Sequence, residues 1–189
     1  MSEGMNLAEF LEYGDDVERY YFNFEDAENF LHRGLKYYLG DKYKWLPEYD
    51  KIVEWLKDND GKGLLCLGDC GRGKTLICKN ILKVFFSKYM LMNYLRFDAV
   101  ELGDNMEIIK EGCTTLIDDV GTELPYSLYG VKRECFSEIV DRAEKNGQLL
   151  VITTNLSTEG IIERYGKRTF DRLRAITVPV VFSGESLRG

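Results

Sequence analysis

The stretch GDCGRGKT at residues 68–75 is the feature that most constrains the fold of this chain. It holds three glycines, a lysine and a threonine in eight positions, directly after the apolar run at residues 64–67. The stretch fits the pattern G-x-x-x-x-G-K-[ST] and stands between a predicted strand and a predicted helix, which is the context that this pattern requires. The sequence therefore predicts a P-loop, a turn whose backbone N–H groups cradle phosphate oxygens.

Each residue type in this loop has a predicted role. Glycines permit positive φ and a close approach of the backbone, and the helix that follows adds the positive end of its dipole. We expect Lys74 to reach the β- and γ-phosphates of a nucleotide and the Thr75 hydroxyl to bind Mg²⁺. A glycine-rich turn without a ligand is the alternative interpretation. The predicted nucleotide-binding residues are Gly68, Cys70, Gly71, Arg72, Gly73, Lys74, Thr75 and Leu76.

The stretch LIDDVGTE at residues 116–123 places two acidic residues at the end of a predicted buried strand. We expect Asp118 to hold Mg²⁺, directly or through water, as a Walker B aspartate does. Asp119 is predicted to orient or deprotonate the attacking water. A polar turn is the alternative, but two adjacent carboxylates repel each other unless a cation lies nearby, which favours a metal and water site.

Two later stretches add polar side chains to the predicted site. ITTNLS at residues 152–157 ends another predicted strand, and Asn155 there would reach the attacking water and the γ-phosphate. A helix cap is the alternative interpretation for Asn155 and Ser157. RYGKRTFDRLRA at residues 164–175 gathers five basic residues. It is interpreted either as a solvated helix face or as the carrier of an arginine finger that neutralises transition-state charge. The finger is favoured because the predicted site has no other late arginine.

Short apolar runs alternate with amphipathic ones after residue 63. Strands are predicted over residues 64–67, 92–97, 115–117, 149–153 and 176–182, and helices over residues 74–88, 128–145 and, as one helix or two, 158–173. Strands that are rich in Leu, Ile and Val and separated by helices indicate a parallel sheet with helices on both faces. The predicted fold class is α/β.

We expect one main domain, because 189 residues of which 44% are hydrophobic bury one ordinary core. Residues 45–189 are assigned to this domain, and residues 1–44 to an acidic, aromatic segment that is a tail, a docking region or part of the core. Within that segment, residues 1–18 predict a short acidic helix or a tail, and residues 25–39 a helix. A further helix is predicted from Pro47 to the turn at residues 59–63.

Charge and residue counts exclude several classes of protein. Residues 1–60 carry 15 acidic and 7 basic side chains, and residues 61–189 carry 17 and 18, which excludes a freestanding polyanion binder. Five cysteines without a CxxC pair argue against a disulfide framework and a zinc site, and the single histidine, His32, argues against a histidine-dependent triad. No signal peptide or membrane span is recognisable, so we expect a cytoplasmic protein.

The four motifs together resemble the AAA+ ATPases of the DnaC/IstB family, the bacterial helicase loaders and their transposition-associated relatives. They are GDCGRGKT, LIDDVGTE, ITTNLS and YGKRTFDRLR, they stand in the family's order, and the resemblance covers roughly residues 45–182. It implies an AAA+ P-loop NTPase of the ASCE type, with Asn155 as the sensor-1 residue, Arg172 as an arginine finger and Arg168 supporting it. Because seven residues follow Phe182, no C-terminal lid domain is expected.

The resemblance also implies a function. We expect an ATPase that uses ATP and Mg²⁺ and serves DNA replication, most simply by helping to place a replicative helicase on DNA. ATP-dependent assembly into a homo-oligomer would bring Arg172 to a neighbouring subunit, and single-stranded DNA would be contacted through the assembly. The alternatives are an IstB-like partner of a transposase, a P-loop small-molecule kinase, and a nucleotide-binding scaffold without turnover.

Overall fold

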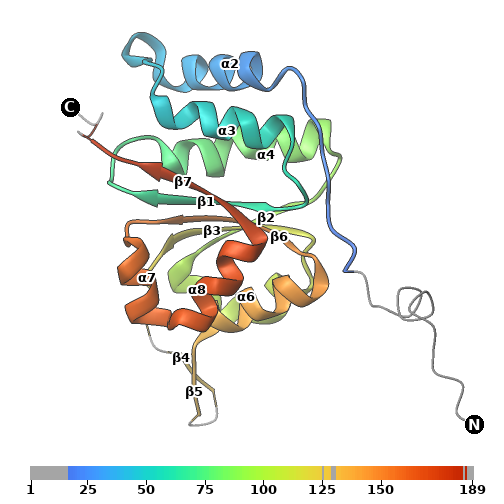
Figure 1. Ribbon diagram of the computed structural model, residues 1–189, viewed down its shortest axis with the longest axis vertical. Helices are drawn as coiled ribbons and strands as arrows, with labels where there is room; N and C mark the ends of the chain where they lie inside the picture. The colour runs from blue at the N-terminus through green and yellow to red at the C-terminus, as the bar shows by residue number, and fades with distance from the viewer. Residues whose placement is uncertain (1–16, 125, 129–130, 185, 187–189) are drawn as a thin grey trace, which may run out of the picture.

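The computed structural model describes residues 17–124, 126–128, 131–184 and 186 of the chain. Most of the stretch predicted as an acidic helix or tail, residues 1–18, lies outside this range. A five-stranded parallel sheet with helices on both faces forms the centre of the molecule (Figure 1), which confirms the predicted α/β class. In sheet order the strands are β2 (Tyr94–Asp98), β3 (Thr114–Val120), β6 (Leu149–Thr154), β1 (Gly63–Gly68) and β7 (Thr177–Phe182).

The first face of the sheet is covered by helices from the N-terminal half of the chain. They are α2 (Ala27–Leu39), the 3₁₀ turn η1 (Gly40–Lys42), α3 (Pro47–Lys57), and a helix made of π-helical η2 (Leu76–Ile81), α4 (Leu82–Val84) and π-helical η3 (Phe85–Tyr89). Aromatic rings hold them together, because Phe22 packs edge-on against Trp55 and Phe85. Part of the segment assigned to residues 1–44 therefore shares its core with α3 and β1.

Helix α3 shows how the sequence sets this packing. Pro47 occupies its first turn, where the missing N–H costs no hydrogen bond. Tyr49, Ile52 and Leu56 are fully buried on one side of the helix, at the spacing that an amphipathic helix requires. The predicted helix from Pro47 to the turn at residues 59–63 is confirmed, as is the helix predicted over residues 25–39.

The second face of the sheet is covered by helices that follow β2. They are the 3₁₀ turn η4 (Ala99–Glu101), α5 (Leu102–Glu111), α6 (Cys135–Asn146), α7 (Thr158–Tyr165) and α8 (Lys167–Ile176). A second cluster of buried side chains, which includes Phe136, Ile139 and Leu173, lies between these helices and the sheet. Positive-φ Gly166 separates α7 from α8, so the stretch predicted as one helix or two forms two.

The prediction of a helix over residues 128–145 is wrong in its first part. Strands β4 (Tyr126–Leu128) and β5 (Val131–Arg133) pair antiparallel, with Tyr126 opposite Arg133, and α6 begins only at Cys135. Strand pairing satisfies the backbone groups that a longer helix would have used. Helix α5 had no counterpart among the predicted elements. In the described residues, no helix has the length and apolar character needed to cross a membrane.

Candidate active site

The order of the strands brings the predicted site residues to one edge of the sheet. Strand β6 lies between β1, which leads into the GDCGRGKT loop, and β3, which ends in the double aspartate. All three strands run in parallel, so their carboxyl ends meet, and neighbouring strands are about 4.8 Å apart. Side chains from three distant parts of the sequence therefore line one cavity.

The glycines of the loop are required by its conformation. Gly68, Gly71 and Gly73 have φ of 110°, 82° and 94°, a region that side-chain-bearing residues rarely adopt. A Cβ on Gly68 would lie 2.1 Å from the carbonyl oxygen of Phe182. The loop therefore packs directly against β7, and the predicted strand–loop–helix context is present.

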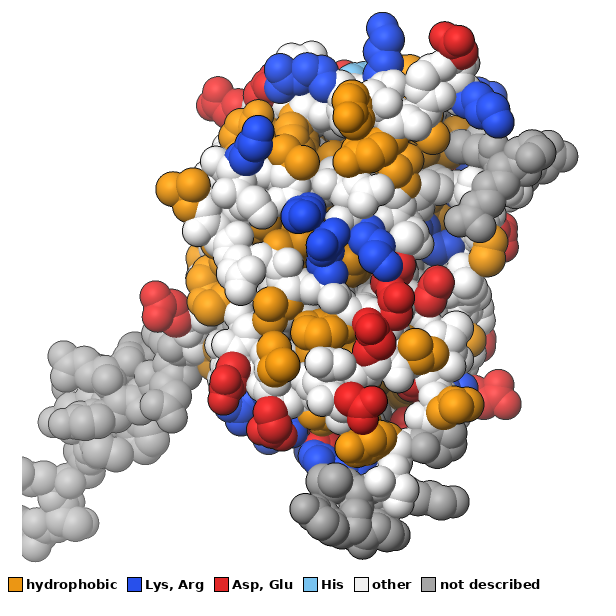
Figure 2. All heavy atoms as spheres, turned by 180° about the vertical axis from the view of Figure 1, so that it is seen from behind, with side chains coloured by type: hydrophobic (Ala, Val, Ile, Leu, Met, Phe, Trp, Pro, Cys, Tyr) orange, Lys and Arg blue, Asp and Glu red, His pale blue; other side chains and the backbone are white. Residues whose placement is uncertain are grey.

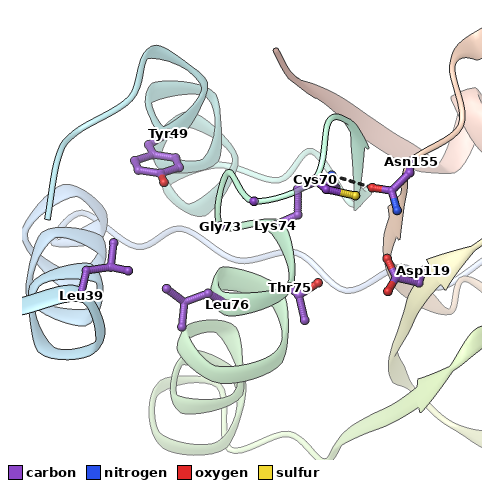
Figure 3. Close-up of a pocket in the computed structure, with 10 residues that line it drawn as sticks. Leu39, Tyr49, Cys70, Gly73, Lys74, Thr75, Leu76, Asp119 and Asn155 are labelled. Atoms are coloured by element: carbon purple, nitrogen blue, oxygen red, sulfur yellow. Dashed lines mark hydrogen bonds between the residues drawn. The ribbon is translucent and has the colours of Figure 1, made fainter. Parts of the chain in front are cut away.

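Lys74 lies at the centre of the cavity and is only 5% exposed. Its Nζ donates to the carbonyl oxygens of Gly68 at 2.5 Å and Asp69 at 2.7 Å, and to Asn155 Oδ1 at 3.1 Å (Figure 3). Burial lowers the pKa of Lys74 below its ordinary value. A buried ammonium beside backbone N–H groups suits a phosphate ligand, whose negative charge would offset the desolvation.

Asp118 is 3% exposed and accepts two hydroxyl hydrogen bonds. Thr75 Oγ1 donates to Asp118 Oδ1 at 3.1 Å, and Thr153 Oγ1 donates to the same oxygen at 2.5 Å. No group of three or more His, Cys, Asp or Glu side chains in the described part of the chain could hold a metal by itself. Thr75 and Asp118 fit a magnesium ion that takes its other ligands from phosphate and water.

Asp119 adopts a left-handed backbone conformation, with φ of 56°. Its N–H donates to Thr153 Oγ1 at 2.9 Å, and its carbonyl oxygen accepts from Thr122 Oγ1 at 2.8 Å. Non-glycine residues with positive φ are uncommon outside sites that hold them in place. The turn directs Asp119 into the cavity opposite the loop, beside Asn155 (Figure 3).

The residue that caps helix α7 is Ser157 and not Asn155. Ser157 is its N-cap, and Ser157 Oγ accepts from the N–H of Gly160 at 3.1 Å. The Asn155 side chain instead accepts from Lys74.

The cavity has a volume of about 220 Å³. Its lining residues are Leu39, Tyr49, Cys70, Gly71, Gly73, Lys74, Thr75, Leu76, Asp119 and Asn155. Leu39 and Tyr49 close the side opposite Asp119 (Figure 3). Their only sequence signal was their place in two predicted helices. Gly68 and Arg72, both predicted to bind nucleotide, do not line it, and the Arg72 side chain is directed to Glu48 instead.

The basic stretch on α8 lies outside this cavity. Arg172 pairs with Asp141 and with Glu144, whose Oε2 is 3.0 Å from Arg172 Nε, and both acidic residues belong to α6. Arg168 lines a separate groove together with Arg172. Arg164 Nη2 donates to the carbonyl oxygen of Glu123 at 2.6 Å, and Tyr165 also hydrogen-bonds to Glu123. The structure thus places neither Arg168 nor Arg172 beside the Lys74 of the same chain.

Solved structures with the same architecture belong to replication proteins. The DnaC helicase loader matches with a TM-score of 0.61 and 20% identity, covering 82% of this chain and 99% of that one. DnaI matches with a TM-score of 0.55 and 20% identity over 67% of this chain and 73% of its own. AMPPCP-bound DnaA from Aquifex aeolicus matches with a TM-score of 0.53 and 14% identity, covering 73% of this chain and 48% of that one.

Comparison of the sequence with protein-family models gave no match, and comparison with curated proteins gave none either. The likeness therefore rests on structure. The chain has the fold of the DnaC-like AAA+ P-loop ATPases.

Proposed function

We propose that this protein binds and hydrolyses ATP with Mg²⁺ and acts as a helicase loader in DNA replication. The observation that carries the proposal is the convergence of Lys74, the Thr75–Asp118 pair and Asn155 at the carboxyl edge of β1, β3 and β6. Bound ATP and Mg²⁺ would supply the phosphoanhydride to be cleaved and the metal that neutralises its oxygens.

The residues at this edge of the sheet have separate proposed roles. Lys74 and the backbone N–H groups of the loop would bind the β- and γ-phosphates, and Thr75 with Asp118 would hold the metal. Asp119 accepts a proton from the attacking water or orients it, because its carboxylate lines the cavity next to Asn155. Asn155 Oδ1 accepts from the Lys74 ammonium, which leaves its amide N–H groups to donate to a γ-phosphate oxygen when ATP is bound.

We assign Arg172 the role of an arginine finger that acts on a neighbouring subunit, with Arg168 beside it. Two observations support this assignment. Arg172 lies outside the cavity of its own chain, and both arginines line one groove between α6 and α8. A residue so placed meets a γ-phosphate only across an interface, which requires a homo-oligomer.

The replication role is supported by the likeness to DnaC and DnaI. The proposed partner is a replicative helicase in the cytoplasm, with single-stranded DNA contacted through the assembly. Figure 2 shows both basic and acidic side chains on one face of the molecule, with a group of basic ones at its centre and acidic ones mostly below them.

Two measurements test the proposal. Phosphate release from ATP, with and without Mg²⁺, tests turnover, and a pull-down from the source cell in the presence of ATP identifies the partner. We expect a replicative helicase to be retained by the wild-type protein and lost with Lys74→Ala. Retention of a transposase would point to the IstB-like role. Phosphorylation of a small molecule would point to a kinase, and ATP binding without phosphate release would point to a scaffold.

A further inference from the structure

A buried ion pair ties the Walker A loop to helix α3. Arg72 Nε donates to Glu48 Oε1 at 2.6 Å, and only 9% of the Arg72 side chain and 6% of the Glu48 side chain are exposed. Glu48 directly follows Pro47 in the first turn of α3, where the proline ring fixes the backbone. The position of the Arg72 guanidinium is therefore set by a helix of the core.

The main chain of the same loop residue is held as well. Tyr49 Oη donates to the carbonyl oxygen of Arg72 at 3.0 Å, and the Tyr49 side chain is fully buried. Because a trans peptide unit is planar, the carbonyl of Arg72 and the N–H of Gly73 point to opposite sides of the chain. The hydrogen bond from Tyr49 thus fixes the direction of the Gly73 N–H, one of the donors that a P-loop offers to phosphate.

The contact between Arg72 and Glu48 joins two buried charges, so breaking it costs free energy. A buried charge that loses a partner is costly, whereas the intact pair offsets much of its own desolvation. Without the carboxylate of Glu48, the guanidinium gains hydration by turning outward. Of the two contacts with α3 described above, the loop then keeps the hydrogen bond from Tyr49 to the Arg72 carbonyl oxygen and loses the ion pair. Two neighbouring residues of α3 therefore control both the side chain and the peptide of one loop residue.

We propose that Glu48 and Tyr49 are positioning residues for the phosphate-binding loop. Through Arg72 they hold the Walker A backbone in its receptive conformation before a nucleotide arrives, so less order has to be gained on binding. The proposal rests on the proposed function, since it concerns the same site. It gives the Arg72 side chain a role within the protein, and it extends the binding machinery to residues outside the G-x-x-x-x-G-K-[ST] pattern.

The test separates nucleotide affinity from stability. Glu48→Gln keeps the shape of the side chain and removes its charge. We expect its Kd for ATP to rise at least about tenfold, because binding must now order the loop, while turnover at saturating ATP changes less than about threefold. The matched control is Glu138→Gln, which removes a carboxylate that Arg133 Nε contacts at 2.9 Å outside the cavity. Its Kd should equal that of the wild-type protein.

Tyr49→Phe is the second variant, because it keeps the buried ring and removes only the hydroxyl. We expect its Kd for ATP to rise about threefold, since one loop carbonyl loses a hydrogen bond. Lower melting temperatures with an unchanged Kd in both variants would reduce the contact to a structural one and overturn the positioning role alone. Failure of the wild-type protein to bind ATP would overturn the proposed function and this inference together.

Discussion

Lys74 in the cavity is a buried cation and Arg172 on α8 is a half-buried one, and the two contact different kinds of oxygen. The described hydrogen bonds of Lys74 go to neutral acceptors, namely two backbone carbonyls and Asn155. Arg172 contacts the carboxylates of Asp141 and Glu144. A phosphate therefore adds the first negative ligand to Lys74, whereas it must compete with two carboxylates for Arg172. Four predictions, given in order of expected effect, test this difference.

The largest effect is expected for Lys74→Ala. It removes the cation that neutral oxygens hold ready for phosphate, so we expect no measurable ATP binding at millimolar nucleotide. Calorimetric titration at fixed Mg²⁺ provides the measurement, with circular dichroism to show that the fold persists. An affinity equal to that of the wild-type protein would remove Lys74 from the site.

Arg172→Ala should retain ATP binding and lose turnover by about 10³-fold, the scale of a lost arginine finger. Mixed with Lys74→Ala protein, it should recover part of the phosphate release, because some interfaces combine an intact loop with an intact Arg172. Sizing chromatography must show that the two variants assemble together. Co-assembly without recovery would contradict action on a neighbouring subunit and favour a solvated basic helix face.

Asp119→Asn tests a second residue of the cavity, and its expected effect on turnover is smaller. We expect ATP binding to persist and phosphate release to fall about 10²-fold, because the amide cannot take a proton from water. Asp118→Asn serves as the contrast, since it should alter the Mg²⁺ dependence instead. Normal turnover in Asp119→Asn would require another base. Glu123, the next acidic residue along the chain, is poorly suited, because Tyr165 donates to its carboxylate and Arg164 Nε lies 3.6 Å from it.

Glu144→Gln should have the smallest effect. It removes one of the two carboxylates beside Arg172 from a partly exposed pair, so the free energy of unfolding should change by less than about 1 kcal/mol. If the carboxylates compete with phosphate for Arg172, turnover rises slightly, by less than about threefold. A fall in turnover to the level of Arg172→Ala would show that Glu144 orients the arginine.

Most of the sheet could be predicted because its strands are continuous apolar runs with clear ends. The strand leading to Gly68 and the one ending before Asn155 carry buried residues on both faces, and the motifs mark their carboxyl ends. The hairpin at Tyr126–Arg133 escaped prediction because its strands are only three residues long, too short for a period of two to be distinguished from a helical one.

The part of the site that the sequence did not predict depends on tertiary contacts. Glu48 and Arg72 are 24 residues apart and belong to different elements, so nothing in the local pattern pairs them. Leu39 and Tyr49 lie in predicted helices, but the place of a residue in a helix does not show that it borders a cavity. The motif predicted the loop, but it did not predict what holds the loop in place.

The parallel direction of the five strands gives the molecule two chemically separate edges. The cavity lies at the carboxyl edge, while Cys113 is exposed just before β3, whose seven residues span about 20 Å. A fluorescent label on Cys113 would therefore lie far from the nucleotide. Cys70, which is also exposed and lines the cavity, is replaced by serine so that the label reacts at Cys113. Cys113 thus provides an attachment point, away from the phosphate site, for following assembly.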